Sequence, residues 1–77
     1  MNNKYKTSDL AIATTLSLYC PIIKIRKDNP RKAEFLFERN PELDGLLDRY
    51  WKKELLVEPR TYFDQLKALK VRLYSSE

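Results

Sequence analysis

The hydrophobic positions of the chain first follow a helical spacing. Residues 10–23 carry no charge, and Asp9 precedes them at the first turn, where the helix dipole favours an acid. Thr7 or Ser8 is the expected N-cap, and Pro21 is the expected stop. The pattern therefore predicts a helix over most of this uncharged run.

Most apolar side chains of this first helix fall on one side, yet Ala11 and Leu18 fall on nearly the opposite side. A helix that is apolar on two sides needs two neighbours. The polar residues 1–6 are expected to form a loose arm, and residues 75–77 are expected to fray.

After the proline, the spacing changes to a period of two, which is typical of strands. Ile23 and Ile25 share one face of the first run, and Phe35 and Phe37 share one face of the second. The turn-forming residues 28–30 separate the two runs. The pattern predicts an antiparallel hairpin with about four loop residues.

Two further helices are predicted in the second half of the chain. Asn40-Pro41-Glu42 combines an N-cap residue, a proline for the first helical position and an acid for the first turn. Residues 55–57 are expected to form a short edge strand before Pro59 opens a third helix. The apolar stripe of the third helix comprises Tyr62, Leu66, Leu69 and Leu73. These elements predict a single small α+β domain over residues 1–77, in the order α-β-β-α-(β)-α, with the antiparallel hairpin packed against the helices.

Composition restricts the chemistry of the chain more than its fold. The 77 residues include no histidine, one glycine and one cysteine, and they carry a net charge of +4. Without histidine there is no imidazole base and no Cys/His zinc site, and a single glycine cannot supply a Gly-rich phosphate loop. We therefore expect no enzymatic activity, no cofactor, no bound metal and no small-molecule substrate.

The cellular setting is predicted from two features of the same region. A secreted domain of this size usually needs several disulfides, so the lone Cys20 favours a reducing cytoplasm. The uncharged run 10–23 contains Pro21 and is shorter than the roughly 20 apolar residues that a membrane span requires. No membrane partner is expected.

Basic residues gather in two places that suit nucleic acid. The predicted hairpin carries Lys24, Arg26, Lys27, Arg31 and Lys32. On the third helix, one sector of about 80° holds Arg60, Lys67 and Lys70 together with the aromatic residues Phe63 and Tyr74. Cations interleaved with rings suit phosphates and stacked bases.

Two other interpretations of these residues stay open. The hairpin cations can pair with Glu34 and Glu38 across a solvated sheet face. Phe63 and Tyr74 can instead widen the core stripe of the third helix, beneath the stems of its lysines.

A protein interface is predicted elsewhere on the chain, from Ala11, Thr14, Thr15 and Leu18 on the first helix and from Trp51 near the end of the second. A small, smooth patch suits close packing with a second copy or another protein, and half-exposed tryptophans are typical of interfaces. Alternatively, the first helix is enclosed within the monomer and Trp51 covers the third strand.

Four blocks of the sequence resemble a known family: Tyr5-Lys6-Thr7-Ser8-Asp9-Leu10, Lys27-Asp28-Asn29-Pro30-Arg31-Lys32, Tyr50-Trp51 and Tyr62-Phe63-x-x-Leu66-Lys67-x-Leu69-Lys70. Together they resemble a small family of prokaryotic and phage proteins classed as a domain of unknown function. The resemblance covers the chain from Tyr5 to Tyr74. It implies a compact stand-alone module and assigns no activity or site.

Two functions are expected from these patterns. The first is a small non-enzymatic protein-interaction module that forms a homodimer or binds a protein target. The alternative is a nucleic-acid-binding accessory or regulatory module that uses the basic hairpin and the third helix.

Overall fold

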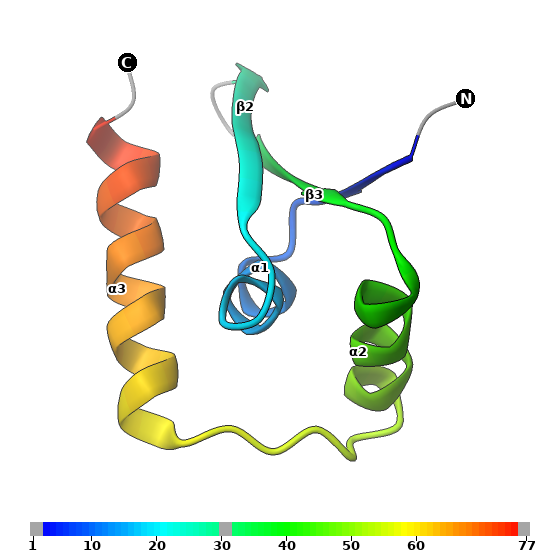
Figure 1. The fold of residues 1–77 in the computed structure, drawn as a ribbon. Helices are drawn as coiled ribbons and strands as arrows, with labels where there is room; N and C mark the ends of the chain where they lie inside the picture. The colour runs from blue at the N-terminus through cyan, green and yellow to red at the C-terminus, as the bar shows by residue number, and fades with distance from the viewer. Residues whose placement is uncertain (1–2, 30–31, 76–77) are drawn as a thin grey trace.

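The computed structural model of the chain describes residues 3–29 and 32–75. In chain order it contains six elements: β1 (Lys4–Thr7), α1 (Leu10–Ser17), β2 (Ile22–Asn29), β3 (Lys32–Glu38), α2 (Pro41–Trp51) and α3 (Pro59–Ser75). The strands form one antiparallel sheet in the order β1-β3-β2. Helix α1 lies across one face of this sheet, with α2 and α3 on opposite sides of α1 (Figure 1). The predicted α+β class is confirmed, but the element order is β-α-β-β-α-α.

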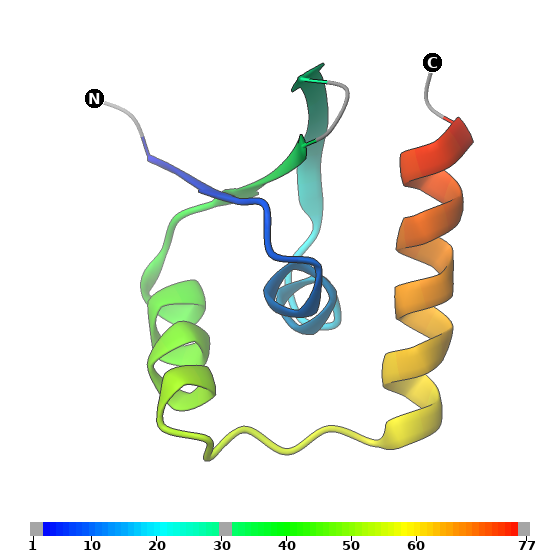
Figure 2. The ribbon, with the colours of Figure 1, turned by 180° about the vertical axis from the view of Figure 1, so that it is seen from behind.

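Strand β1 takes up the last part, residues 4–6, of the loose arm that was expected over residues 1–6. It pairs with β3 in the register Lys4↔Glu38 to Thr7↔Phe35, along the edge of β3 opposite β2 (Figure 2). Its one apolar residue, Tyr5, is half-buried against the core. The expectation of a loose arm is therefore wrong for the residues of this strand.

The first helix begins after Asp9, not after Thr7 or Ser8. The Asp9 Oδ1 atom accepts hydrogen bonds from the backbone N–H groups of Ala11 at 2.9 Å and Ile12 at 3.1 Å. Asp9 is thus the N-cap, because its carboxylate satisfies two donors that the first turn leaves free. Thr7 belongs to β1, and its hydroxyl oxygen accepts from the Asp9 N–H.

The hairpin of β2 and β3 is confirmed, but its strands end at Asn29 and begin at Lys32, which leaves two positions between them in place of about four. A second correction concerns its base. Ile25 pairs with Phe35 and Ile22 pairs with Phe37, and the register shifts between Ile22 and Lys24. The irregularity turns Ile22 toward the core and leaves Ile23 exposed, whereas strict alternation placed Ile23 on the core side. Phe35 and Phe37 are fully buried, as their spacing predicted.

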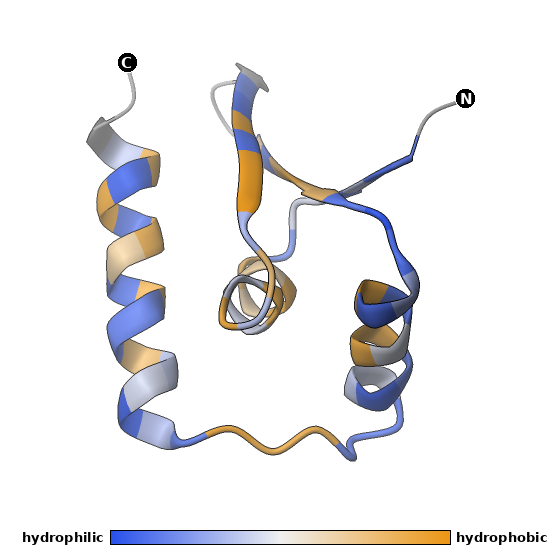
Figure 3. Cartoon of the chain, in the orientation of Figure 1, coloured by the Kyte–Doolittle hydropathy of each residue, from blue (hydrophilic) through white to orange (hydrophobic). Residues whose placement is uncertain are grey.

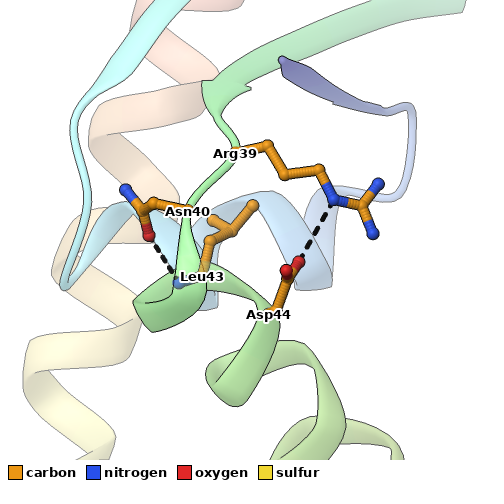
Figure 4. A network of polar contacts seen from close by, with 4 residues as sticks. All are labelled: Arg39, Asn40, Leu43 and Asp44. Carbon is orange, nitrogen blue, oxygen red and sulfur yellow. Dashed lines mark hydrogen bonds and ion pairs between the residues drawn. The ribbon is translucent and has the colours of Figure 1, made fainter.

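Helix α2 starts where the sequence predicted. The side chain of Asn40 accepts a hydrogen bond from the Leu43 N–H at 2.8 Å, and Pro41 takes the first helical position. Beside this cap, Arg39 Nε lies 3.2 Å from Asp44 Oδ1 (Figure 4). Polar side chains therefore hold the connection between the sheet and α2.

Helix α2 ends in a Schellman motif. The Lys53 N–H bonds the Tyr50 carbonyl at 3.1 Å, and the Glu54 N–H bonds the Arg49 carbonyl at 2.9 Å. Lys53 has a φ of 60°, the left-handed conformation that this motif requires. Residues 54–58 then run as an extended linker to α3 and form no strand, so the predicted third strand at residues 55–57 is wrong.

The core is centred on α1, which contacts α2, α3 and β1. Its two-sided apolar pattern correctly predicted that the helix needs two neighbours. Between α1 and α3, Gln65 Nε2 donates to Ser17 Oγ at 3.0 Å. The buried apolar residues are Ile12, Ala13, Leu16, Cys20, Phe35, Phe37, Leu43, Leu46 and Leu69. The molecule is flat, with principal extents of 37, 35 and 18 Å.

Candidate functional site

The patch predicted on the first helix is not an open surface. Thr14 is 0% exposed and Thr15 is 6% exposed, and both lie in the layer that α1 shares with its neighbours. Their hydroxyls donate to the carbonyls of Leu10 at 2.7 Å and Ala11 at 2.8 Å. Ala11 and Leu18 are only half-buried. The prediction of a partner surface here is wrong for the two threonines, because the small fold uses both sides of α1 for its own core.

The strip predicted on the third helix is exposed along its whole length. Phe63 is 57% exposed and Tyr74 is 71% exposed, so neither ring widens the core stripe. The three cations of the strip, Arg60, Lys67 and Lys70, are exposed as well. The buried side of α3 instead centres on Leu69, as its spacing predicted.

The hairpin and the C-terminal end of α3 lie at the same end of the molecule (Figure 1). Lys27 Nζ donates to the carbonyl oxygen of Leu73 at 2.7 Å, across 46 positions of sequence. This contact brings the basic hairpin next to the end of the strip that carries Lys70 and Tyr74. Arg60 lies at the opposite end of α3.

The other four predicted cations of the hairpin differ in their surroundings. Lys24 and Arg26 are exposed, and Arg26 pairs in register with Glu34, as the solvated-face interpretation expected. Lys32 is exposed at the start of β3. Arg31 lies outside the described residues.

Two cations near the hairpin were missed by the sequence interpretation. Lys4 and Lys6 belong to β1, and their pairing with β3 places them on the same sheet as the hairpin. Both are exposed. Their alternation with the half-buried Tyr5 and Thr7 was a signal for a strand, but a run of four residues with one apolar side chain is weak.

A second candidate surface surrounds Trp51, at the end of α2. A hollow of about 450 Å³ is lined by Tyr50, Trp51, Lys53 and Leu55. The Tyr50 and Trp51 rings meet edge to face with centroids 5.3 Å apart. Trp51 is 66% exposed, so it does not cover a third strand as the alternative interpretation held.

The surroundings of this hollow are apolar on the linker side. Leu56 is 86% exposed, and Figure 3 shows the apolar stretch of the linker between α2 and α3. Burial raises the pKa of the Tyr50 hydroxyl above its ordinary value, and the Asp9 carboxylate and Tyr62 raise it further. Tyr50 therefore stays a neutral hydrogen-bonding group near pH 7.

Two acidic side chains of α2 are paired with cations, and the single cysteine is buried. Asp44 is paired with Arg39, and the Asp48 Oδ2 atom lies 3.1 Å from the Lys52 Nζ atom. Within residues 3–29 and 32–75, no three acidic, cysteine or histidine side chains gather as a metal site would require. Burial raises the pKa of the free Cys20 thiol, with a further contribution from the charge of Glu42, so the thiolate is disfavoured.

None of the helices in the described part of the chain has the length and apolar character needed to cross a membrane. Neither the curated proteins nor the solved structures contain a significant match to the chain. A protein family does match, over residues 2–75, and it is described as a domain of unknown function. The chain therefore belongs to the DUF5659 family.

Proposed function

We propose that the protein is a nucleic-acid-binding accessory module that works through the hairpin and the exposed strip of α3. The observation that carries the proposal is the exposure of Phe63 and Tyr74 among the cations of this strip. Rings that the core does not need can stack on bases, while neighbouring lysines neutralise phosphates.

The distribution of charge supports the same side of the molecule. Helix α3 carries four cations, Arg60, Lys67, Lys70 and Arg72, and one acid, Asp64. Helix α2 carries three acids and one cation, and it lies on the far side of α1 (Figure 1). A polyanion would therefore be attracted to α3 and the sheet and repelled from α2.

The test is a fluorescence-anisotropy titration of the protein against single-stranded DNA, duplex DNA and RNA at about 50 and about 200 mM salt. Binding that weakens at least about tenfold over this range supports phosphate contacts. Absence of binding at the lower salt overturns the proposal.

Two variants assign the binding to the strip. Lys67→Gln/Lys70→Gln should lower the log–log salt slope on single strands by about 1.4, because each phosphate contact contributes about 0.7. Phe63→Ala/Tyr74→Ala should weaken single-strand binding by at least about 1 kcal/mol with the slope unchanged, because stacking involves no counterion release. Equal effects of both variants on slope would contradict these separate roles.

The Trp51 surface favours a second candidate function, a protein-interaction module. Exposed tryptophan and leucine side chains beside a hollow are typical of protein-binding sites. Trp51→Ala should then abolish self-association, measured by sedimentation equilibrium, while Lys52→Ala leaves it unchanged. A wild-type protein that stays monomeric at millimolar concentration would argue against the homodimer.

For either function, we propose that the protein works in the cytoplasm of a prokaryotic cell and is encoded by the cell or by a phage. The single buried thiol of Cys20 supports a reducing compartment. The resemblance of the sequence blocks described above supports the prokaryotic or phage origin.

A further inference from the structure

We propose that the outer face of the sheet binds the phosphate backbone of nucleic acid without regard to base sequence. Lys6 of β1 and Lys24 of β2 are the residues that would hold the phosphates. This inference rests on the proposed function and extends it to β1, which was not among the predicted binding elements.

The sheet register places the two lysines on either side of one residue. Lys6 and Lys24 both pair with Leu36, the first from β1 and the second from β2. Because neighbouring strands lie about 4.8 Å apart, the two lysine backbones stand roughly 10 Å apart across the sheet. Both side chains are exposed, and Leu36 between them is half-buried.

Lys6, Leu36 and Lys24 form one row across the outer face, which we call the central row. The neighbouring rows on each side of it contain acids. Lys4 pairs with Glu38, and Arg26 pairs with Glu34, so each of these rows combines one cation with one acid. The central row holds two cations and no acid. The positive potential of the face is therefore greatest around Lys6 and Lys24.

The other face of the sheet is used by the core. Phe35 and Phe37 are buried there, and Tyr5 packs against the same core. Among the described residues, α1 lies on that inner side and no helix crosses the outer face (Figures 1 and 2). The outer face is thus a solvated surface that a long polyanion can reach.

The side chains of the outer face indicate what it recognises. The described residues of the rows around Leu36 include no aromatic ring, so this face cannot stack bases as the strip of α3 can. The feature left for Lys6 and Lys24 to bind is the phosphate, which is the same at every base. Leu36, the apolar residue of the central row, is half-buried and has little surface to insert into a lipid bilayer, but Ile23 beside Lys24 is exposed. The vesicle measurement below therefore tests a lipid surface directly.

The experiment compares two charge-matched variants. Lys6→Gln/Lys24→Gln removes the central cations, and Lys52→Gln/Lys53→Gln removes two exposed cations near Trp51. Binding to two duplexes and two single strands of unrelated sequence is measured by anisotropy over a salt series. The sheet variant should lower the log–log salt slope by about 1.8 on duplexes and about 1.4 on single strands, equally for both sequences. The Lys52/Lys53 variant should keep the wild-type slope.

A third variant, Lys6→Arg/Lys24→Arg, keeps the charge and should restore the wild-type slope, which separates lost phosphate contacts from an altered fold. If the wild type binds and the sheet variant keeps its slope, this inference is overturned while the proposed function stands. If the wild type binds no nucleic acid, the proposed function is overturned, and this inference is overturned with it. Binding to phosphatidylserine vesicles but to none of the nucleic acids would also overturn the inference.

Discussion

Lys53 holds the left-handed backbone conformation at a position where glycine is the usual residue. Its φ of 60° closes the Schellman motif that ends α2. For a residue with a Cβ atom this conformation costs roughly 1–2 kcal/mol, because the side chain approaches its own carbonyl oxygen. The same residue lines the hollow at Trp51, so the strain lies beside a candidate binding surface.

Lys53→Gly should therefore stabilise the protein by about 0.5–1 kcal/mol, since glycine adopts this conformation without steric cost. Urea unfolding followed by circular dichroism measures the change. The matched control is Lys52→Gly, one residue earlier, where φ is −82° and glycine should destabilise instead. Stabilisation by both substitutions would show that the backbone conformation at Lys53 is not the cause.

Glu58 caps the start of α3 through an exposed carboxylate. Its Oε1 atom accepts from the Thr61 N–H at 2.7 Å and from the Thr61 hydroxyl at 2.9 Å. These hydrogen bonds, with a further one from the Arg60 N–H, lower the pKa of the Glu58 carboxyl below its ordinary value of 4.5. The charged form is thus favoured in the folded state.

A carboxyl with a lowered folded pKa stabilises the fold above its unfolded pKa and loses that contribution as the pH falls through the folded value. Glu58→Gln should therefore be less stable than the wild type at about pH 6, and the difference should shrink toward about pH 3. Thermal unfolding of both proteins across this range provides the measurement. A difference that is independent of pH would assign the effect to lost packing.

At the scale of elements, the sequence predicted those whose signals are local. The start of α2 follows from Asn40 and Pro41, and the start of α3 from Pro59. The hairpin follows from two runs of alternating apolar and polar residues, one on each side of a turn, and Phe35 and Phe37 belong to the second run. At the helix starts the stabilising contacts lie within a few residues of the signal, and in the hairpin they join two strands that follow each other directly in the sequence.

The errors concern elements that depend on distant partners. Strand β1 contains one apolar side chain, Tyr5, and it exists because its backbone pairs with β3 some thirty residues later. Residues 55–57 are apolar enough for a strand, but no strand of the described sheet lies beside them. For the same reason the row of Lys6, Leu36 and Lys24 could not be predicted from spacing.

Helix α3 is held to the rest of the molecule by its inner stripe, and this stripe can be tested separately from the outer strip. Leu69→Ala should cost about 2–5 kcal/mol, because Leu69 is fully buried and its removal leaves a cavity. Val71→Ala, on the exposed side, should change stability by less than about 0.5 kcal/mol. Chemical unfolding of the two variants makes the comparison, and similar losses would contradict the assignment of the buried face.

At the scale of the molecule, α1 is the element on which the others depend. It contacts both other helices and the sheet, and five of its eight residues are buried. The linker of residues 54–58 is mostly exposed and lies outside the helices and strands. Stability should thus be greatest at the centre and least at the linker.

Native-state hydrogen exchange should show the slowest amides in α1 and in β3, the central strand. Amides of linker residues 55–57 should exchange fastest among the described residues, because these residues lie outside the helices and strands, whereas the Glu54 N–H is bonded to the Arg49 carbonyl. Amide exchange followed by NMR gives this profile directly. Equal protection of α3 and α1 would mean that α3 opens only when the whole molecule unfolds.

The extended linker has a consequence for how two copies of the chain can meet. Helix α3 buries Leu69 in a core centred on α1, and the linker joins it to α2, which lies on the other side of α1. An α3 released from its own α1 finds the same surface on any other copy, so two chains can exchange these helices reciprocally. Such an intertwined dimer would form on refolding at high concentration and would keep the native secondary structure. Its dissociation rate would be limited by the detachment of α3 from α1.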